Sequence, residues 1–342
     1  MTEPPSPLRM LLSRHTRRRE FISLLGGAAA AWPLRAHAQR FDEMRLIGLL
    51  GGASPEAYKP FLSALHRGMS ESGYVEGRNL TIEYRWAEGQ YDRLLALAAD
   101  LVNRQVKVIA TIGGTPVALA AKAATATIPI VFVVGGDPIK LGLVSSFNRP
   151  DGNVTGVSQF ASVLFPKRLE LIRELLPTKT MISVLVNPTN PNAETIVKDT
   201  ETAAHALGQR TIVLRASSET ELSSVLATGI QRSDALIVMD DAFFLSQRNQ
   251  LSSIAASYRV PAVYPWPEFV KAGGLMSYGT SLGDAYRLSG IYVARLLSGD
   301  RPANLPVLRP TKFELVINMK TARTLGLEIP PTLLARTDEV IE

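Results

Sequence analysis

The sequence of 342 residues contains no cysteine and only four histidines. Without cysteine, the chain has no disulfide, no thiolate metal ligand, no cysteine nucleophile and no lipid-modified N-terminal cysteine. Two of the histidines, His15 and His37, lie in a segment that we expect to be removed. Only His66 and His205 are then left for imidazole chemistry.

The net positive charge is also small in the part of the chain that follows residue 38. The formal net charge is +6, but residues 1–38 hold six arginines against two glutamates and so account for +4 of it. The rest of the chain has a net charge of +2 and contains no long run of Lys or Arg. Nucleic-acid binding, by contrast, depends on concentrated positive charge. We therefore expect no nucleic-acid partner.

Long apolar runs are missing as well. After residue 38 no stretch approaches the ~20 uninterrupted apolar residues that a membrane-spanning helix needs, so we expect a soluble mature protein. With 46% hydrophobic and 20% charged residues, the composition is typical of a folded globular chain. The length allows two ordinary domains.

Residues 1–38 have the organisation of an export signal. An arginine pair at 18–19 precedes an apolar run over 21–32, and Ala36-His37-Ala38 has the small-x-small pattern of a cleavage site. The run over 18–22 resembles the twin-arginine signal that addresses folded proteins to the bacterial Tat exporter. A general secretory signal with adjacent arginines is the alternative. Both routes predict a periplasmic protein that is cleaved near Ala38.

Short apolar runs alternate with longer amphipathic segments from Arg45 onward. Continuously apolar strands, each followed by a helix, are typical of parallel sheets covered on both faces, so we predict an α/β fold with two doubly wound lobes. The predicted strands are 45–50, 80–86, 106–112, 128–134, 181–187, 211–214, 235–239, 262–264 and 275–278. The predicted helices are 57–72, 91–104, 115–125, 165–175, 192–207, 219–230, 244–258 and 283–297. A turn-rich stretch at 148–153 joins the two blocks.

Motifs of the common enzyme classes are absent from the sequence. No G-x-G-x-x-G follows a strand, and there is no G-x-x-x-x-G-K-[ST] phosphate loop, no G-x-S-x-G nucleophile elbow and no H-E-x-x-H zinc pair. His66 and His205 fall within predicted helices and are interpreted as surface or boundary residues. We therefore predict no catalytic residues, no metal and no cofactor.

The loops after the first strands suit a small anion. Ligands of open α/β sheets bind beyond the carboxyl ends of strands, where helix N-termini offer free N–H groups. Gly113-Gly114-Thr115-Pro116 places two glycines and a hydroxyl before a helix, which suits a carboxylate. Thr115 either binds a ligand or caps the helix, and both roles can coexist.

Three further residues of this block are candidates with the same alternatives. Ser54 follows a strand and two glycines, and Gly136 and Asp137 follow the strand at 128–134. Ser54 either reaches a ligand or caps the next helix. For the side chain of Asp137, capping is the favoured role.

In the second block the candidates are acidic and amide side chains. Asn187 opens the loop after 181–187, and Asp240-Asp241 follows the strand at 235–239. Two adjacent carboxylates facing a cleft suit a ligand ammonium group, while Phe243 offers an apolar wall. We expect one of the two aspartates to act only as a helix cap.

Aromatic side chains follow the last two predicted strands. Tyr264 and Trp266 stand in Tyr-Pro-Trp-Pro, and Tyr278 stands in Ser-Tyr-Gly. Trp266, held between prolines, suits a stacking surface for a ligand. The alternative is an ordinary core tryptophan.

Four stretches resemble the ABC-transporter substrate-binding family that includes tryptophan- and tyrosine-type binding proteins. They are Gly113-Gly114-Thr115-Pro116, Gly135-Gly136-Asp137-Pro138 with NRPDGNVTGV at 148–157, VPAVYPWPEFVKAGGLMSYG at 260–279, and FELVINMKTARTL at 313–325. The resemblance spans nearly all of residues 44–342. It implies a type I periplasmic-binding fold whose two lobes close on a small solute.

The resemblance also implies the division of the chain and the roles of its loops. Lobe 1 is expected at 44–155 plus 279–308 and lobe 2 at 156–278 plus 309–342, with hinges near 153–157, 277–279 and 306–310. Groups around Ser54 and Thr115 would hold a carboxylate. The acidic loop would hold an amine through Asp241, with Asp240 as the second choice. That loop reads Asp-Asp-Ala-Phe here, whereas amino-acid binders of the family tend to have Asp followed by Asn and Thr.

The function implied is capture of a small carboxylate-bearing solute, an aromatic or other amino acid being favoured, for an ABC permease in the inner membrane. A monomer is expected. A ligand sensor for a membrane receptor and a binder of a plain carboxylate are the alternatives. An extracytoplasmic enzyme is disfavoured by the missing catalytic motifs. A transcriptional regulator is disfavoured because an export leader stands where DNA-binding helices would be.

Overall fold

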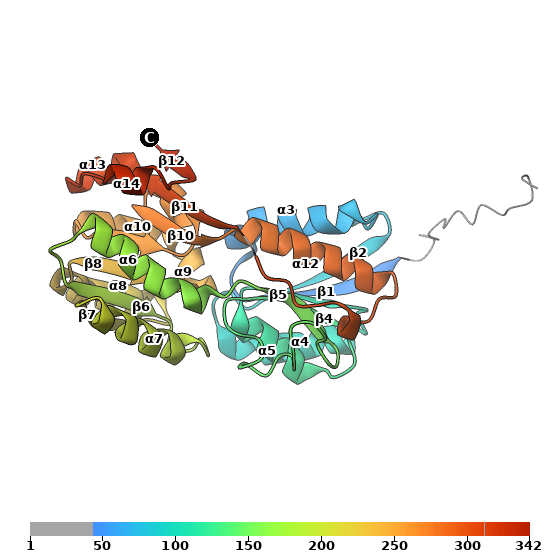
Figure 1. Cartoon of the computed structure of the whole chain (residues 1–342). Helices are drawn as coiled ribbons and strands as arrows, with labels where there is room; N and C mark the ends of the chain where they lie inside the picture. The colour runs from blue at the N-terminus through green and yellow to red at the C-terminus, as the bar shows by residue number, and fades with distance from the viewer. Residues whose placement is uncertain (1–43, 311) are drawn as a thin grey trace, which may run out of the picture. The chain divides into compact units, whose positions relative to one another are not determined.

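The computed structural model describes residues 44–310 and 312–342. The predicted export signal at 1–38, with its cleavage site near Ala38, lies outside the described residues. Between residues 44 and 342, strands and helices alternate to form two separate sheets (Figure 1). The predicted α/β class is confirmed.

Lobe 1 is built on a five-stranded parallel sheet. Helices α3 (Pro55–Glu71) and α12 (Leu282–Leu297) lie side by side over one face of it, and α4 (Leu94–Asn103) and α5 (Thr115–Ala124) lie over the other (Figure 1). The strand order is β2 (Leu80–Trp86), β1 (Arg45–Gly51), β3 (Ile109–Ile112), β4 (Ile130–Val134) and β5 (Val154–Ser158). Every residue of β3 and β4 is buried, as expected for central strands covered on both faces.

Lobe 2 is built on a seven-stranded sheet. The strand order is β12 (Glu339–Ile341), β11 (Phe313–Asn318), β10 (Met276–Thr280), β9 (Ala262–Tyr264), β8 (Ala235–Val238), β6 (Met181–Val186) and β7 (Arg210–Arg215). Its helices are α6 (Phe165–Leu175), α7 (Ala193–Ala206), α8 (Glu219–Gly229), α9 (Ala242–Ser246), α10 (Arg248–Ser257), α11 (Pro267–Lys271), α13 (Met319–Leu325) and α14 (Pro331–Leu334). Short 3-10 helices occur at η1 (Tyr91–Arg93), η2 (Ala161–Leu164), η3 (Ile230–Arg232) and η4 (Pro302–Asn304).

Three connections link the two sheets. Residues 159–164 lead from β5 to α6, Ser281 separates β10 from α12, and Leu308 pairs with β5 before the chain enters β11. The third connection explains a departure from the predicted all-parallel sheets. Because the chain re-enters lobe 2 where β10 leaves it, β11 runs antiparallel to β10, while every other pair is parallel.

The predicted elements differ from the observed ones mainly where apolar residues are few. β5 was not predicted because VTGVS contains only two large apolar residues, and the segment 153–157 was assigned to a hinge. The single helix predicted at 244–258 is divided at Gln247, which ends α9 and precedes α10. β11, β12, α11, α13 and α14 were not among the predicted elements either.

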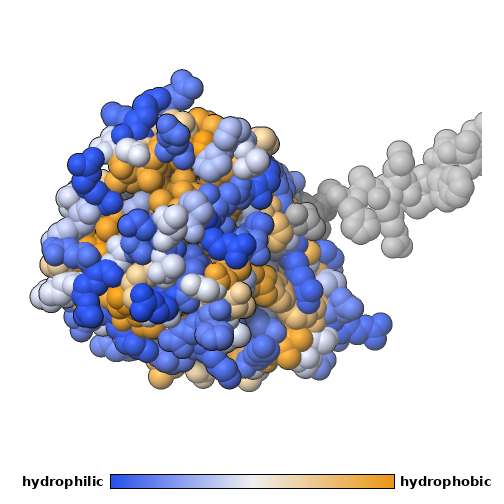
Figure 2. All heavy atoms as spheres, turned by 60° about the vertical axis from the view of Figure 1, so that its left-hand side comes forward, coloured by the Kyte–Doolittle hydropathy of each residue, from blue (hydrophilic) through white to orange (hydrophobic). Residues whose placement is uncertain are grey.

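The hydrophobic core lies along the two sheets, and the surface carries both hydrophilic and hydrophobic residues. Aliphatic residues of the central strands are buried in both lobes. In the view of Figure 2, hydrophilic residues cover much of the molecule, with hydrophobic residues between them. The exposed large hydrophobic side chains come from separate segments, namely Met44, Val75, Leu95, Ile139, Val163, Tyr258, Phe313 and Val340.

Two glycines allow α3 and α12 to pack closely, which gives a prediction for stability. A β-carbon on Gly68 would overlap the carbonyl oxygen of Arg287, and one on Gly290 would overlap that of Leu65. Gly68→Ala should therefore push the helices apart and lower the free energy of unfolding by about 1–3 kcal/mol. Gly283→Ala, also in α12, is the matched control because its nearest neighbouring atom, Ser281 Oγ, is 3.9 Å away. The melting temperatures of the Gly68→Ala and Gly283→Ala variants, measured by thermal unfolding, check this prediction. Equal melting temperatures for Gly68→Ala and the wild type would contradict the packing argument.

Candidate functional site

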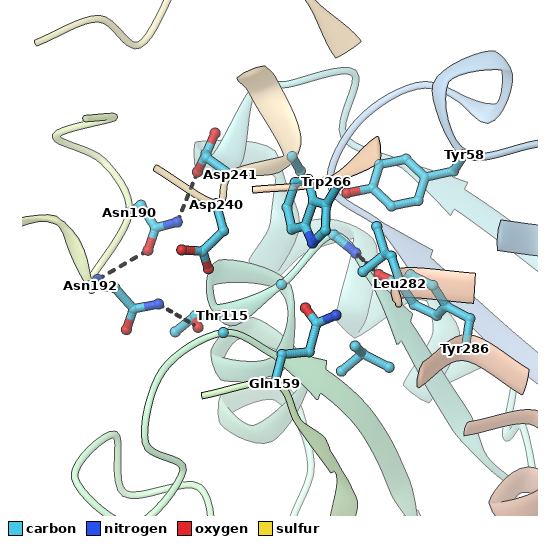
Figure 3. Close-up of a pocket in the computed structure, with 15 residues that line it drawn as sticks. Tyr58, Thr115, Gln159, Asn190, Asn192, Asp240, Asp241, Trp266, Leu282 and Tyr286 are labelled. Atoms are coloured by element: carbon cyan, nitrogen blue, oxygen red, sulfur yellow. Dashed lines mark hydrogen bonds between the residues drawn. The ribbon is translucent and has the colours of Figure 1, made fainter. Parts of the chain in front are cut away.

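A pocket lies where the carboxyl ends of strands from both lobes meet (Figure 3). The free space at its centre is about 20 Å³, which is room for about one water molecule, so a larger ligand requires the walls to move apart. Lobe 1 contributes Tyr58, residues 113–115, Val133, Gly135, Leu282 and Tyr286. Lobe 2 contributes Asn190, Asn192, Asp240, Asp241, Ala242 and Trp266, and Gln159 comes from the first connection between the lobes.

One end of the pocket is the N-terminus of α5. Gly113 and Gly114 have φ angles of +118° and +85°, a backbone region that favours glycine. A β-carbon on Gly113 would lie 2.8 Å from the amide nitrogen of Gly52, whereas Gly114 has open space above it. The loop therefore brings main-chain N–H groups to the pocket, and together with the helix dipole they suit a carboxylate.

Thr115 does not cap this helix. α5 begins at Thr115 itself, its N-cap is Gly114, and no side chain makes the capping hydrogen bond. The buried hydroxyl of Thr115 instead accepts a hydrogen bond of 2.9 Å from Asn192 Nδ2 of lobe 2. The capping alternative for Thr115 is thus wrong, and its side chain faces the pocket rim.

The two adjacent aspartates have different surroundings. Asp241 is the N-cap of α9, and its Oδ1 accepts from the Phe243 amide at 2.9 Å. Its carboxylate also accepts from Asn187 Nδ2 at 3.1 Å, from Asn190 Nδ2 at 2.8 Å and from the Tyr91 hydroxyl at 3.1 Å. Figure 3 shows the Asp241 carboxylate turned toward Asn190. Asp241 therefore has its acceptor positions occupied by the protein.

Asp240 has a free acceptor. Its side chain points into the pocket (Figure 3), and its Oδ1 is buried without a hydrogen-bond partner among the described residues. Burial raises the pKa of Asp240 to about 6, with the nearby Arg168 guanidinium acting in the opposite direction. An unpartnered buried carboxylate costs free energy unless a ligand donor meets it.

Aromatic rings form the apolar walls. Tyr58 and Tyr286 meet edge to face with ring centroids 6.2 Å apart, and the Tyr286 hydroxyl accepts from the Gly113 amide at 3.0 Å. Trp266, which also lines the pocket, is 6% exposed and stacks on Phe269 with ring centroids 6.4 Å apart. These rings offer apolar contact to a flat ligand group.

Four of the residues predicted to bind a ligand line this pocket: Gly114, Thr115, Asp241 and Trp266. Gly136 and Asp137 line a neighbouring pocket that also includes Asn192, and Asp137 caps a turn by accepting from the Ile139 amide at 2.9 Å.

The other predicted binding residues lie outside the pocket lining. Ser54 caps α3 by accepting from the Ala57 amide, and Asn187 supports Asp241. Phe243 packs on Phe244. Tyr264 is fully buried and stacks on Phe269 at 4.9 Å, and Tyr278 stacks on Phe313.

Several lining residues were not predicted. Asn190 and Asn192 belong to the loop after β6, whose first residue, Asn187, was predicted to bind a ligand. The turn-rich sequence of this loop could therefore have indicated the two asparagines. Gln159 follows the unpredicted strand β5. Tyr58 and Tyr286 lie in the amphipathic helices α3 and α12, where aromatic residues on the buried face are indistinguishable from core residues.

Two absences hold for the part of the chain that the structure describes. In residues 44–310 and 312–342, no group of three or more His, Asp or Glu side chains is arranged to hold a metal ion. Over the same residues, no helix is both long and apolar enough to cross a membrane.

Comparison with known proteins identifies the family. Residues 53–341 match the family described as ABC transporter substrate binding protein. The chain is 27% identical over 273 residues to the tyrosine-binding protein of Clostridioides difficile (strain R20291), covering 80% of this chain and 77% of that protein.

Solved structures agree with this match. A conserved domain protein from Vibrio cholerae has a TM-score of 0.81 at 28% identity, covering 87% of this chain and 100% of the other. An ABC domain from Streptococcus pneumoniae in complex with L-Trp has a TM-score of 0.79 at 27% identity, with the same coverage. The chain therefore belongs to the ABC transporter substrate-binding proteins, a family of extracytoplasmic solute-binding proteins, and has their type I periplasmic-binding fold.

Proposed function

We propose that the protein captures an α-amino acid with an aromatic or other large apolar side chain and delivers it to an ABC importer in the inner membrane. The charge of the pocket carries this proposal: two carboxylates line it, and no Lys, Arg or His does so among the described residues. A ligand that fits must bring a positive group to Asp240. Its carboxylate is then placed at the N-terminus of α5.

The aromatic walls support the choice of side chain. Trp266, Tyr58 and Tyr286 all line the pocket, so an indole or phenyl group bound there would contact aromatic rings. The relatives point the same way, since one is a tyrosine-binding protein and another was solved with L-Trp. A plain carboxylate would bring a negative charge beside Asp240 without a compensating ammonium group.

Delivery is proposed to depend on closure of lobe 1, built on the five-stranded sheet, on lobe 2, built on the seven-stranded sheet. Two hydrogen bonds between the lobes support this: Asn192 Nδ2 to Thr115 Oγ1 at 2.9 Å and the Tyr91 hydroxyl to Asp241 at 3.1 Å. A ligand that contacts both lobes shifts the equilibrium toward the closed form by its difference in affinity for the two forms. The importer then recognises the closed form. The export signal at 1–38, cleaved near Ala38, would place the protein on the correct side of the membrane.

Matched ligand analogues test the proposal. Calorimetry of ligand-stripped protein with L-Trp, L-Tyr and L-Phe should show binding, and 3-indolepropionate, which lacks the ammonium group of L-Trp, should bind at least about 30-fold more weakly. Tryptamine, which lacks the carboxylate, should also lose affinity. Equal affinity for 3-indolepropionate and L-Trp would instead assign a carboxylate binder, and no binding of any amino acid would refute the proposal.

Transport is tested separately in cells. Deletion of the gene should abolish high-affinity uptake of the radiolabelled amino acid found by calorimetry, and the restored gene should recover it. Normal uptake in the deletion strain would contradict delivery to an importer and favour a sensory role.

A further inference from the structure

Gln159 is a pocket residue whose side-chain amide lacks a partner. It follows β5 in the first connection between the lobes and lines the pocket, and Figure 3 shows its amide extending into it. The residue is only 4% exposed, and its Nε2 is buried without a hydrogen-bond partner among the described residues. A buried donor without an acceptor costs free energy, so this amide is suited to an acceptor on a ligand.

The neighbouring amides of the pocket are already paired. Asn190 and Asn192 each donate from Nδ2 to another side chain, at 2.8 Å and 2.9 Å. Of the residues that line the pocket, only Gln159 and Asp240 hold a buried side-chain nitrogen or oxygen without a partner among the described residues. Asp240 offers an acceptor and Gln159 offers a donor, so a ligand that satisfies both atoms has polar groups of both kinds.

The backbone fixes the position of Gln159. Its N–H donates to the carbonyl oxygen of Val134 at 2.8 Å, and the N–H of Ala161 donates to that of Gly135 at 2.8 Å. Between them Phe160 has a φ angle of +49°, which is uncommon for a residue other than glycine. Backbone of this kind persists where the surrounding structure holds it, and it is frequent at ligand sites. Gln159 is therefore tied to the end of β4 before a ligand binds.

The ligand group left for Gln159 is on the side chain of the amino acid. The proposed function assigns the ammonium group to Asp240 and the carboxylate to the N-terminus of α5. The amide of Gln159 shares the rest of the lining with the rings of Tyr58, Tyr286 and Trp266. A phenolic hydroxyl both accepts and donates, so it matches a primary amide in either orientation. An indole N–H only donates, and a phenyl ring carries neither group.

We propose that Gln159 is a specificity-determining residue whose amide forms a hydrogen bond with a hydroxyl on the aromatic ring of the ligand. The inference rests on the proposed function, because that function places both charged ends of the ligand elsewhere in the pocket. A hydroxyphenyl side chain pairs the amide, whereas a phenyl side chain leaves it buried and unpaired. Sites that hydrogen-bond a hydroxyl discriminate against the analogue without it for this reason.

Calorimetry of ligand-stripped protein with L-Tyr and L-Phe tests this role, since the two amino acids differ only in the hydroxyl. The wild type should bind L-Tyr at least about tenfold more tightly than L-Phe. Gln159→Met, which has a similar length but no nitrogen or oxygen in its side chain, should bring the two affinities to within about threefold, mainly by weakening L-Tyr. Gln231→Met, at an exposed glutamine of η3, is the matched control and should keep the wild-type ratio.

A wild type without a preference for L-Tyr would overturn the proposal. An equal loss of affinity for both amino acids in Gln159→Met would also overturn it, because the amide would then bind a group that the two share. Thermal unfolding of ligand-free protein shows whether the variant folds. Gln159→Met should melt no lower than the wild type, since an apolar group replaces an unpaired buried amide. A markedly lower melting temperature would show that the amide serves the fold and would contradict the proposal.

A second pair of probes separates this inference from the proposed function. 3-(4-Hydroxyphenyl)propionate and 3-phenylpropionate differ in the same hydroxyl but lack the ammonium group. A hydroxyl preference in this pair that is lost in Gln159→Met, without binding of any amino acid, would support the role of Gln159 and refute only the proposed function. Absence of binding by all four compounds would refute both.

Discussion

Asp240→Asn is expected to weaken amino-acid binding by about 30-fold to several thousand-fold. The substitution keeps the shape of the side chain but removes the charge that faces the ligand ammonium group. Loss of one partner of a buried charge pair costs about 2–5 kcal/mol, and each 1.4 kcal/mol is tenfold in affinity. Calorimetry at pH 7.5, where Asp240 is ionised, gives the dissociation constants.

The charge of Asp240 favours ligand binding but lowers the free energy of unfolding of the ligand-free protein. The pKa of Asp240 is raised from 3.8 in the unfolded chain to about 6 in the folded protein. The folded state therefore holds the proton more tightly, so this group stabilises the fold below about pH 4 and that contribution is lost as the pH rises through about 6. Asp240→Asn, which carries no charge, should therefore unfold at a higher temperature than the wild type at pH 7.5 and show a smaller gain in stability on acidification.

Asp137→Asn is the matched control for Asp240→Asn. Asp137 also follows a strand end, but it caps a turn and lines the neighbouring pocket. Since Asn serves equally well as a cap, this variant should bind amino acids like the wild type. If both variants bind normally, the ammonium group has another partner and the charge argument for the pocket fails.

The roles of the two aspartates show how far the sequence could be interpreted. The sequence indicated an acidic pair at the end of a strand, and the structure places both residues at the pocket. The choice between them depended on where the next helix begins. The predicted start at 244 left both positions open, whereas α9 begins at Ala242 and makes Asp241 the cap. An error of two residues in a helix boundary is ordinary, and here it decides which carboxylate is free.

The same reasoning applies to the other end of the pocket. The predicted start of α5 at Thr115 was right. That Gly114 rather than Thr115 is the N-cap follows only from the backbone angles of Gly114, which the sequence does not give. Tyr58 and Tyr286 are separated by more than 200 positions, and only the packing of α3 on α12 brings them together. Short strands such as β5 take their conformation from the neighbouring strand rather than from their own sequence.

Asp241→Ala is expected to act mainly on stability. The carboxylate accepts from Asn187, Asn190, the Phe243 amide and Tyr91, and all four donors lose their acceptor in the variant. A buried donor without an acceptor costs about 1–3 kcal/mol, and a lost helix cap costs about 1 kcal/mol. Removal of a buried charge offsets part of this, since burial raises the pKa of Asp241 above its ordinary value. The net expectation is a loss of about 2–4 kcal/mol, or about 5–10 °C in melting temperature.

Thermal unfolding with and without ligand separates this role from that of Asp240. Asp241→Asn keeps the cap and one acceptor oxygen, so it should recover about half of the lost stability. Asp241→Ala should also weaken ligand binding, because the hydrogen bond between Tyr91 and Asp241 joins the two lobes. A variant that melts like the wild type but loses amino-acid affinity more than about 30-fold would reverse the assignment and make Asp241 the partner of the ammonium group.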